Sequence, residues 1–156
     1  MRLHRRPTVA VLATGSELLP AGAPLGYGQI PDSNSMLVTQ LAAEAGAIPE
    51  VFACHTDTPE SFLAGLRTLA DNADLIVTTG GVSAGAFDVV KAALLREGVR
   101  FEKVAMQPGK PQGYGMVVDS AGRRVPIICL PGNPVSSFVT FLLLVRPFLL
   151  KLQGAT

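Results

Sequence analysis

The sequence predicts an α/β fold, a three-layer α/β/α sandwich with a mostly parallel mixed sheet, and three observations support this. Short β-branched apolar runs at 7–13 and 73–79 are typical of strands that are buried on both faces. Amphipathic helical segments separate the strands, and right-handed crossovers place such helices on both faces of a sheet. A hairpin pattern within 112–130 adds at least one antiparallel edge.

The first half of the chain is predicted to contain two helices. The first covers 33–46, with Asp32 or Ser33 as its N-cap and Gly46 at its end. Its expected inward face consists of Leu37, Val38, Leu41 and Ala45. A strand around 50–54 precedes the second helix. That helix is expected to begin at Thr58 and Pro59 and to turn Phe62, Leu66 and Leu69 inward.

The second half is predicted to begin with a helix over 86–97 that ends at Gly98, with Phe87, Val90 and Leu94 facing inward. Strands are then expected within 99–106 and 112–130, the latter two joined by the turn 119–124. A last helix is predicted over 134–152, kinked by Pro147. Its expected core positions are Val135, Phe138, Leu142 and Leu149.

Composition restricts the classes of partner. The 156 residues suit a single domain over 1–156, which we expect to be a fragment of a longer multidomain protein. With 13 basic against 12 acidic residues the net charge is +1, which argues against a broad nucleic-acid surface and against a polybasic membrane patch. Small molecules or protein surfaces are therefore the expected partners.

Two further features suggest a cytoplasmic protein with no membrane segment. The apolar run 136–145 stops at Arg146 and Pro147, short of the roughly 20 residues that span a bilayer. Cys54 and Cys129 lie in apolar segments without the spacing of a zinc site, so we expect buried reduced thiols.

Three glycine-bearing loops follow predicted strands, at 13–19, 79–88 and 130–137. In open α/β sheets the ligand crevice lies outside the carboxyl ends of the strands, and glycine-rich loops there bind anions, phosphate above all. Glycines that serve only the turn geometry are the alternative for each loop. Neither GxGxxG nor a P-loop is present, which argues against a Rossmann or P-loop nucleotide site.

Charged residues surround these loops. Glu17, Asp32 and Asp88 would flank the same edge of the sheet, where acids can hold a divalent cation over a bound phosphate. Helix capping is the alternative for Asp32 and Asp88. Lys103 and Lys110 could present charge to an anion, and solvated lysines are the alternative.

Five ordered motifs together resemble one known family. They are "ATGSELL", "IPDSN", "DLIVTTGGVSAGAFDVVK", "PGKP" and "LPGNPVSSFVTF". They are similar to the molybdopterin-binding domain of the molybdopterin molybdenumtransferases, the family that includes the gephyrin E domain, and the resemblance runs from about residue 9 to 154. It implies that molybdate is inserted into adenylylated molybdopterin, with release of AMP and with the help of Mg²⁺ or another divalent cation.

The resemblance also implies roles for individual residues. The implied catalytic residues are Glu17, Asp32, Asp88, Lys103 and Lys110, of which the three acids would be the metal ligands. The implied molybdopterin-binding residues are Thr14, Gly15, Ser33, Asn34, Thr79, Gly80, Gly81, Val82, Ser83, Gly85, Pro131, Gly132, Asn133, Pro134 and Ser136. Catalysis would rest mainly on positioning and charge stabilisation.

The chain departs from the family pattern at two positions, where Ser16 replaces a common acid and Gln107 a common lysine. Family members are usually multidomain homodimers whose cleft also uses another domain, so the isolated chain is expected to bind without efficient turnover.

Three other readings share this fold. They are a nucleotide pyrophosphatase or hydrolase of the competence-damage-inducible type, a non-catalytic scaffold like gephyrin, and the sister family that adenylylates molybdopterin. The "GGVS" and "PGNP" signatures disfavour the first, and "PGNP" in place of "PGSP" disfavours the last.

Overall fold

The computed structural model describes residues 4–15, 17–53, 59–81 and 89–155, and its centre is a six-stranded mixed sheet. In spatial order the strands are β4 (Ile48–Ala53), β1 (Thr8–Ala13), β5 (Leu75–Thr79), β8 (Arg124–Leu130), β7 (Pro111–Val118) and β6 (Arg100–Lys103). The first four are parallel to one another, β7 pairs antiparallel with β8, and β6 pairs antiparallel with β7. This arrangement confirms the predicted mostly parallel sheet with an antiparallel edge.

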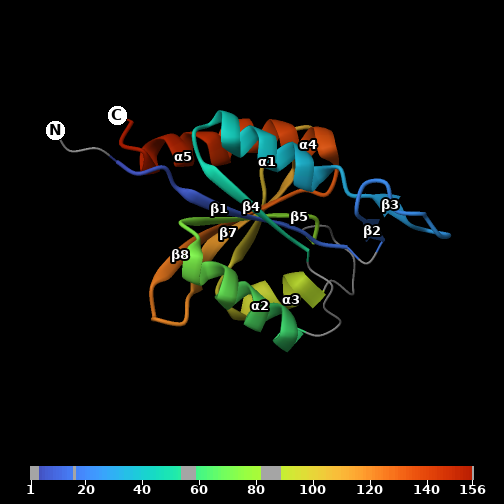
Figure 1. Ribbon diagram of the computed structural model, residues 1–156, viewed down its shortest axis with the longest axis horizontal. Helices are drawn as coiled ribbons and strands as arrows, with labels where there is room; N and C mark the ends of the chain where they lie inside the picture. The colour runs from blue at the N-terminus through green and yellow to red at the C-terminus, as the bar shows by residue number, and fades with distance from the viewer. Residues whose placement is uncertain (1–3, 16, 54–58, 82–88, 156) are drawn as a thin grey trace.

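Helices cover both faces of the sheet, as Figure 1 shows. They are α1 (Asn34–Glu44), α2 (Pro59–Asn72), α3 (Val89–Arg96), α4 (Pro134–Thr140), a π-helical turn η1 (Phe141–Val145) and α5 (Arg146–Leu152). The short strands β2 (Leu18–Leu19) and β3 (Ile30–Pro31) pair in parallel as a separate sheet. The predicted three-layer sandwich is therefore confirmed.

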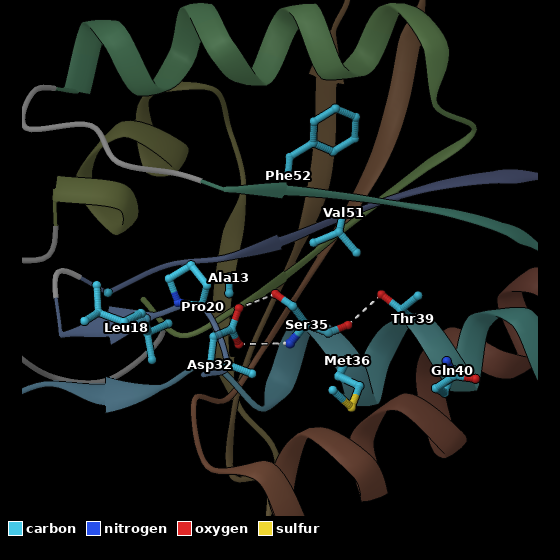
Figure 2. Close-up of a pocket in the computed structure, with 13 residues that line it drawn as sticks. Ala13, Leu18, Pro20, Asp32, Ser35, Met36, Thr39, Gln40, Val51 and Phe52 are labelled. Carbon is cyan, nitrogen blue, oxygen red and sulfur yellow. Dashed lines mark hydrogen bonds between the residues drawn. The ribbon is translucent and has the colours of Figure 1, made fainter. Parts of the chain in front are cut away.

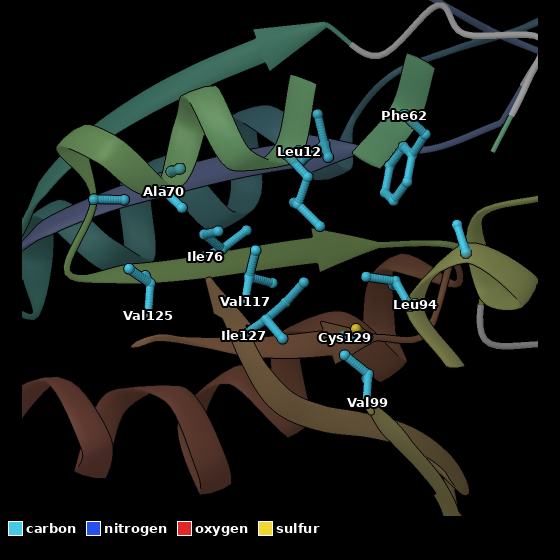
Figure 3. Packing of buried hydrophobic residues seen from close by; sticks show 14 residues of the cluster. Leu12, Phe62, Ala70, Ile76, Leu94, Val99, Val117, Val125, Ile127 and Cys129 are labelled. Carbon is cyan, nitrogen blue, oxygen red and sulfur yellow. The ribbon is translucent and has the colours of Figure 1, made fainter. Parts of the chain in front are cut away.

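Successive side chains of each strand point to opposite faces of the sheet, and this gives one hydrophobic core on each face. Phe62, Leu66 and Leu94 of α2 and α3 pack on one face of the sheet, where Leu12 and Ile76 meet them (Figure 3). The opposite face carries Val9, Val11, Leu75, Val77 and Leu130, which pack against α1 and the 134–152 helix. Central strands that are apolar on both faces are what a parallel sheet inside two helix layers requires.

Three of the four predicted core positions of the last helix are wrong. Leu149 is buried as predicted, but Val135, Phe138 and Leu142 are exposed, and Phe141 and Val145 are buried in their place. A regular α-helical period led to the wrong set, because the π turn η1 directly before Pro147 alters the period and keeps residues 141, 145 and 149 on the sheet. Pro147 does not end the helix.

We expected the apolar run of this helix to be too short to span a bilayer, and the length of the helix in the structure corrects that expectation. Pro134–Leu152 is continuous, has a mean hydropathy of 1.8 and is long and apolar enough, by length and composition alone, to cross a bilayer. Core helices of proteins without membrane segments pass the same test. Here 33% of the apolar window is buried, and its inner residues pack against the sheet.

Smaller expectations have mixed outcomes. In α1, Val38 and Ala45 are buried as predicted, but Ala42 takes a core position that we assigned to Leu37, which is half-buried. Cys129 is a free, buried thiol, and burial raises its pKa to about 12, so it is unreactive near neutral pH. Cys54, Thr58 and Phe87 lie outside the described residues.

Candidate functional site

The three predicted loops meet at the carboxyl ends of β1, β5 and β8. The backbone N–H and the hydroxyl of Thr14, directly after β1, both donate to the carbonyl of Thr79 at 2.9 and 3.0 Å. The next residue, Gly80, donates its own N–H to the carbonyl of Leu130 at 3.2 Å. The ends of these three strands are thus joined by hydrogen bonds.

Gly80 is the point of closest approach. Its φ is +85°, and an added Cβ would lie 2.4 Å from the carbonyl oxygen of Thr14. An added Cβ at Gly132 would lie 3.5 Å from the Cα of Gly80, so the third loop also touches this residue. Since its N–H is already engaged, Gly80 contributes space rather than a hydrogen-bond donor.

Asn34 joins α1 to the loop after β8. Its Nδ2 donates to the carbonyl of Gly132 at 2.7 Å, across 98 residues of sequence. Its Oδ1 is buried and has no hydrogen-bond partner among the residues that the structure describes, and the same holds for the hydroxyl of Thr79. Buried polar atoms without partners are rare in folded proteins, and they are candidates for contact with a ligand or water.

The turn after β8 is stiff. Pro131 and Pro134 bracket Gly132 and Asn133, and Asn133 is the N-cap of α4, with its Oδ1 accepting from the N–H of Ser136 at 3.1 Å. The Ser137 hydroxyl donates to the carbonyl of Pro131. Ser136 and Ser137 are buried.

Asp32 has the capping contacts that we considered as its alternative role. Its two carboxylate oxygens accept from the N–H and from the hydroxyl of Ser35, as the dashed lines in Figure 2 show. Ser33 occupies the N-cap position without a side-chain cap bond. Each Asp32 oxygen keeps a lone pair that Ser35 does not use, so capping leaves room for a cation ligand.

Glu17 and Asp32 flank the small sheet of β2 and β3. The pairing of β2 with β3 includes donation from the Ile30 N–H to the Glu17 carbonyl and from the Asp32 N–H to the Leu19 carbonyl, at 2.8 and 2.7 Å. The Glu17 carboxylate folds back over Gly15, within 2.6–2.8 Å of the place a Cβ would occupy. Within the described residues, no set of three His, Cys, Asp or Glu side chains could hold a metal ion.

The two lysines are exposed and belong to one corner of the sheet. Lys103 is in register with Pro111, and the carbonyl of Lys110 accepts from the N–H of Val104 at 2.7 Å. The loop between them packs against the 134–152 helix, because a Cβ at Gly109 would lie 2.5 Å from the Thr140 methyl group. This contact places the loop that carries Lys110 beside the 134–152 helix, which directly follows the loop after β8.

A pocket of about 330 Å³ lies beside these residues, between the end of β1, α1 and β4 (Figure 2). Gly15 and Asp32 line it, together with residues that we did not predict: Leu18, Leu19, Pro20, Ala21, Met36, Thr39, Gln40, Val51 and Phe52. The walls are mainly apolar. Leu18 and Leu19 belong to the "ATGSELL" motif, but no motif marks the side chains from α1 and β4, which only the tertiary structure brings beside it.

Several predicted residues lie outside the described part of the chain. They are Val82, Ser83, Gly85 and Asp88. Gly81 is described and has a φ of +66°. The structure therefore brings Thr14, Asn34, Thr79, Gly80 and Gly132 together. It shows Glu17 and Asp32 at the ends of the β2–β3 pair without a contact between their carboxylates, and the third predicted acid lies outside the described residues.

Comparisons with known proteins show which family the chain belongs to. Residues 10–151 match the family described as "Probable molybdopterin binding domain". Molybdopterin molybdenumtransferase 2 of Mycobacterium tuberculosis is 46% identical over 96% of this chain, and molybdopterin molybdenumtransferase of Haemophilus influenzae is 39% identical over 99%. A solved structure, the molybdopterin biosynthesis MoeA protein from Pyrococcus horikosii, superposes with a TM-score of 0.76 at 33% identity, covering 97% of this chain.

These relatives are much longer than the chain. It spans 37% of each of the two molybdenumtransferases and 36% of the solved structure.

Proposed function

Since the chain belongs to the family of molybdopterin-binding domains, we propose that it binds molybdopterin, in its adenylylated form, at the carboxyl edge of the sheet. In a full-length protein the domain would support insertion of molybdate, with release of AMP. The names of the relatives, molybdopterin molybdenumtransferase, support this activity.

One observation carries the proposal: Gly80 lies in contact with both Thr14 and Gly132, and Asn34 fixes the third loop from the side. The Thr14 carbonyl fills the space that a Cβ of Gly80 would need, so this glycine lets the loops meet at the carboxyl edge where the ligand would bind. The Oδ1 of Asn34 and the hydroxyl of Thr79 have no hydrogen-bond partner in the described fold and are available for hydrogen bonds to a ligand. Ser136 and the loop 82–88 complete the proposed phosphate contacts.

The donor set near the site fits a divalent cation such as Mg²⁺. Mg²⁺ prefers carboxylate oxygens and is commonly held by one or two carboxylates together with substrate phosphates. Glu17 and Asp32 would provide these carboxylates, with Asp88 as the third candidate. When bound, the cation would neutralise charge on the pyrophosphate group.

The lysine-bearing corner would contribute positive charge. Lys103 and Lys110 would attract the anionic substrates and stabilise charge as the adenylate bond breaks, which is a task of positioning and electrostatics. We also propose that the full-length protein is a cytoplasmic homodimer that binds neither nucleic acid nor membrane. The isolated chain would bind its ligand without efficient turnover.

Titration calorimetry tests the proposal. Molybdopterin and its adenylylated form are titrated into the wild-type chain and into Lys110→Gln, with and without Mg²⁺. We expect saturable binding that Lys110→Gln weakens about tenfold, because one charge-assisted contact to phosphate is lost.

Lys151→Gln is the matched control, because it removes the same charge from an exposed lysine at the end of α5, and it should leave the affinity unchanged. If both variants weakened the binding equally, the effect of Lys110→Gln would come from the change in net charge and not from a contact between Lys110 and the ligand. Failure of the wild-type chain to bind either pterin would contradict the placement of the site in this domain.

A further inference from the structure

The outer face of β7 is apolar and exposed. Tyr114, Met116 and Val118 alternate along the strand, and each is exposed by 41–48%. The intervening Val117 is buried under α2 and α3 on the other face. An antiparallel strand with one face in water normally carries polar side chains on that face, so three apolar ones are unexpected.

The strand register extends this face onto β8. Met116 is opposite Pro126, and Tyr114 is opposite Ile128, which packs against the core beneath α1 and the 134–152 helix. We name the five residues Tyr114, Met116, Val118, Pro126 and Ile128 the outer shelf. It lies on the same side of the sheet as α1, α4 and α5.

The helix layer on this side stops short of the shelf. The core beneath α1 and the 134–152 helix is built on β1, β5 and the end of β8. No described element packs over Tyr114, Met116 and Val118. Leu143 and Leu144 of the 134–152 helix are also exposed. The shelf therefore lies one helix layer, about 10 Å, below the outer surface of the helices.

Two arginines lie at the ends of the shelf. Arg100 is in register with Tyr114 and Arg124 with Val118, and both arginines are exposed. Glu102, in register with Gln112, is the acidic residue on the same face of the neighbouring strand β6. Neither Arg100 nor Arg124 has an acidic ion-pair partner among the described residues.

We propose that the outer shelf binds an amphipathic helix of a protein partner, with its apolar stripe on the shelf and acidic residues along its flanks. A helix has the diameter that fills one missing position of the layer, and acidic flanks complement the arginines at both ends. A flat membrane would meet the neighbouring helices before it reached a recessed strand. A second copy of the chain would bring the arginines of both copies together. The proposal does not rest on the proposed function.

Selection from a peptide library tests the proposal. Helical 18-residue peptides carry a fixed Leu and Ile stripe, and their flanks are randomised among Glu, Lys and Ser. They are selected on the folded wild-type chain. We expect enrichment of Glu at the flanks, and at least a tenfold loss of affinity of the enriched peptide for Met116→Glu and for Arg124→Glu.

Met36→Glu is the matched control, since Met36 is an exposed methionine on α1, outside the shelf, and the peptide affinity should stay within twofold. Three other results would overturn the proposal. They are enrichment without acidic flanks or with equal binding to Met116→Glu, self-association that Met116→Glu abolishes, and binding to phosphatidylglycerol vesicles that Met116→Glu abolishes.

Discussion

The two edges of the sheet differ in how they use their buried polar groups. At the amino edge, the Arg123 guanidinium donates to the carbonyls of Ala70 and Ala73 and to the Asp119 carboxylate at 2.6–3.1 Å. At the carboxyl edge, the Asn34 Oδ1 and the Thr79 hydroxyl are buried without a partner among the described residues. Both edges use polar groups to hold segments together, as Thr14 and the Asn34 Nδ2 do at the carboxyl edge, but the carboxyl edge also keeps two buried oxygens without a partner.

One glycine at each edge, Gly80 and Gly122, shows a similar difference between the two edges. Gly80 and Gly122 have nearly equal φ values, +85° and +84°. A Cβ at Gly80 would meet the Thr14 carbonyl at 2.4 Å, whereas a Cβ at Gly122, in the turn between β7 and β8, would meet nothing within 4 Å. The same backbone conformation thus serves close approach at one edge and only a turn at the other.

Alanine at these two glycines should produce the largest difference. Gly122→Ala should cost about 1–2 kcal/mol, the penalty for a left-handed alanine, and Gly80→Ala should cost about 3 kcal/mol or more because the methyl group also clashes with backbone. Denaturant unfolding of both variants measures the two costs. Equal costs would show that the loops do not meet at Gly80.

Removal of the Arg123 side chain should have the next largest effect. Arg123→Met leaves the carbonyls of Ala70 and Ala73 and the Oδ2 of Asp119 without the guanidinium donor, and we expect a loss of about 2 kcal/mol of unfolding free energy. The adjacent Arg124→Met, which lacks these contacts, should cost less than about 0.5 kcal/mol. A similar loss in both variants would rule out the carbonyl contacts as the cause.

Asn34→Ala should affect ligand binding more than folding. The substitution removes the bond to Gly132 and the partnerless Oδ1, and we expect about a tenfold weaker affinity for adenylylated molybdopterin. Asn72→Ala at the opposite edge is the control for a general effect of asparagine removal. Calorimetric titration of both variants compares the edges, and unchanged binding in Asn34→Ala would remove Asn34 from the site.

The smallest effect should be a pH dependence of the amino edge. Burial by itself would raise the pKa of Asp119, but donors from Arg123 and Ala121 outweigh it and lower the pKa, and Arg5 and Thr8 do the same for Asp74. A carboxylate with a lowered pKa stabilises the fold above its unfolded pKa of about 3.9, and this contribution is lost as the pH falls through the folded value. Wild type should therefore be more stable than Asp119→Asn at pH 7, and the gap should narrow below about pH 4.

Thermal unfolding between pH 2.5 and 7 measures this gap. A difference that stays constant down to pH 2.5 would mean that the carboxylate charge does not contribute.

Local patterns were sufficient for most elements. The apolar runs predicted β1 and β5, and the Thr-Pro start and four-residue spacing predicted α2 with Phe62 and Leu66 inward. They failed for most core positions of the 134–152 helix, because a π turn changes the period and small polar residues are buried on its inner face. The Ser137 and Thr140 hydroxyls donate to backbone carbonyls, and the Ser136 hydroxyl donates to the Asn133 side chain. A search for apolar side chains cannot anticipate small polar residues on a buried face.

The candidate site divides in the same way. The glycines of the three loops and the acids Glu17 and Asp32 were evident from the sequence, since special backbone positions and carboxylates are visible as residue types. The bond from Asn34 to Gly132, the pocket that Met36 and Val51 line, and the shelf on β7 were not. Each depends on which segments become neighbours.

The sequence by itself determined the order of strands and helices, the positions of the turns and the chemical types in the loops, because these depend on periodicity, φ preferences and charge over a few residues. Only the tertiary structure decided which loop glycine admits a close approach, which buried oxygen keeps no partner and which strand face stays uncovered. These properties arise from contacts between segments up to 98 residues apart, such as Asn34 and Gly132, and local pattern carries no information about such distances.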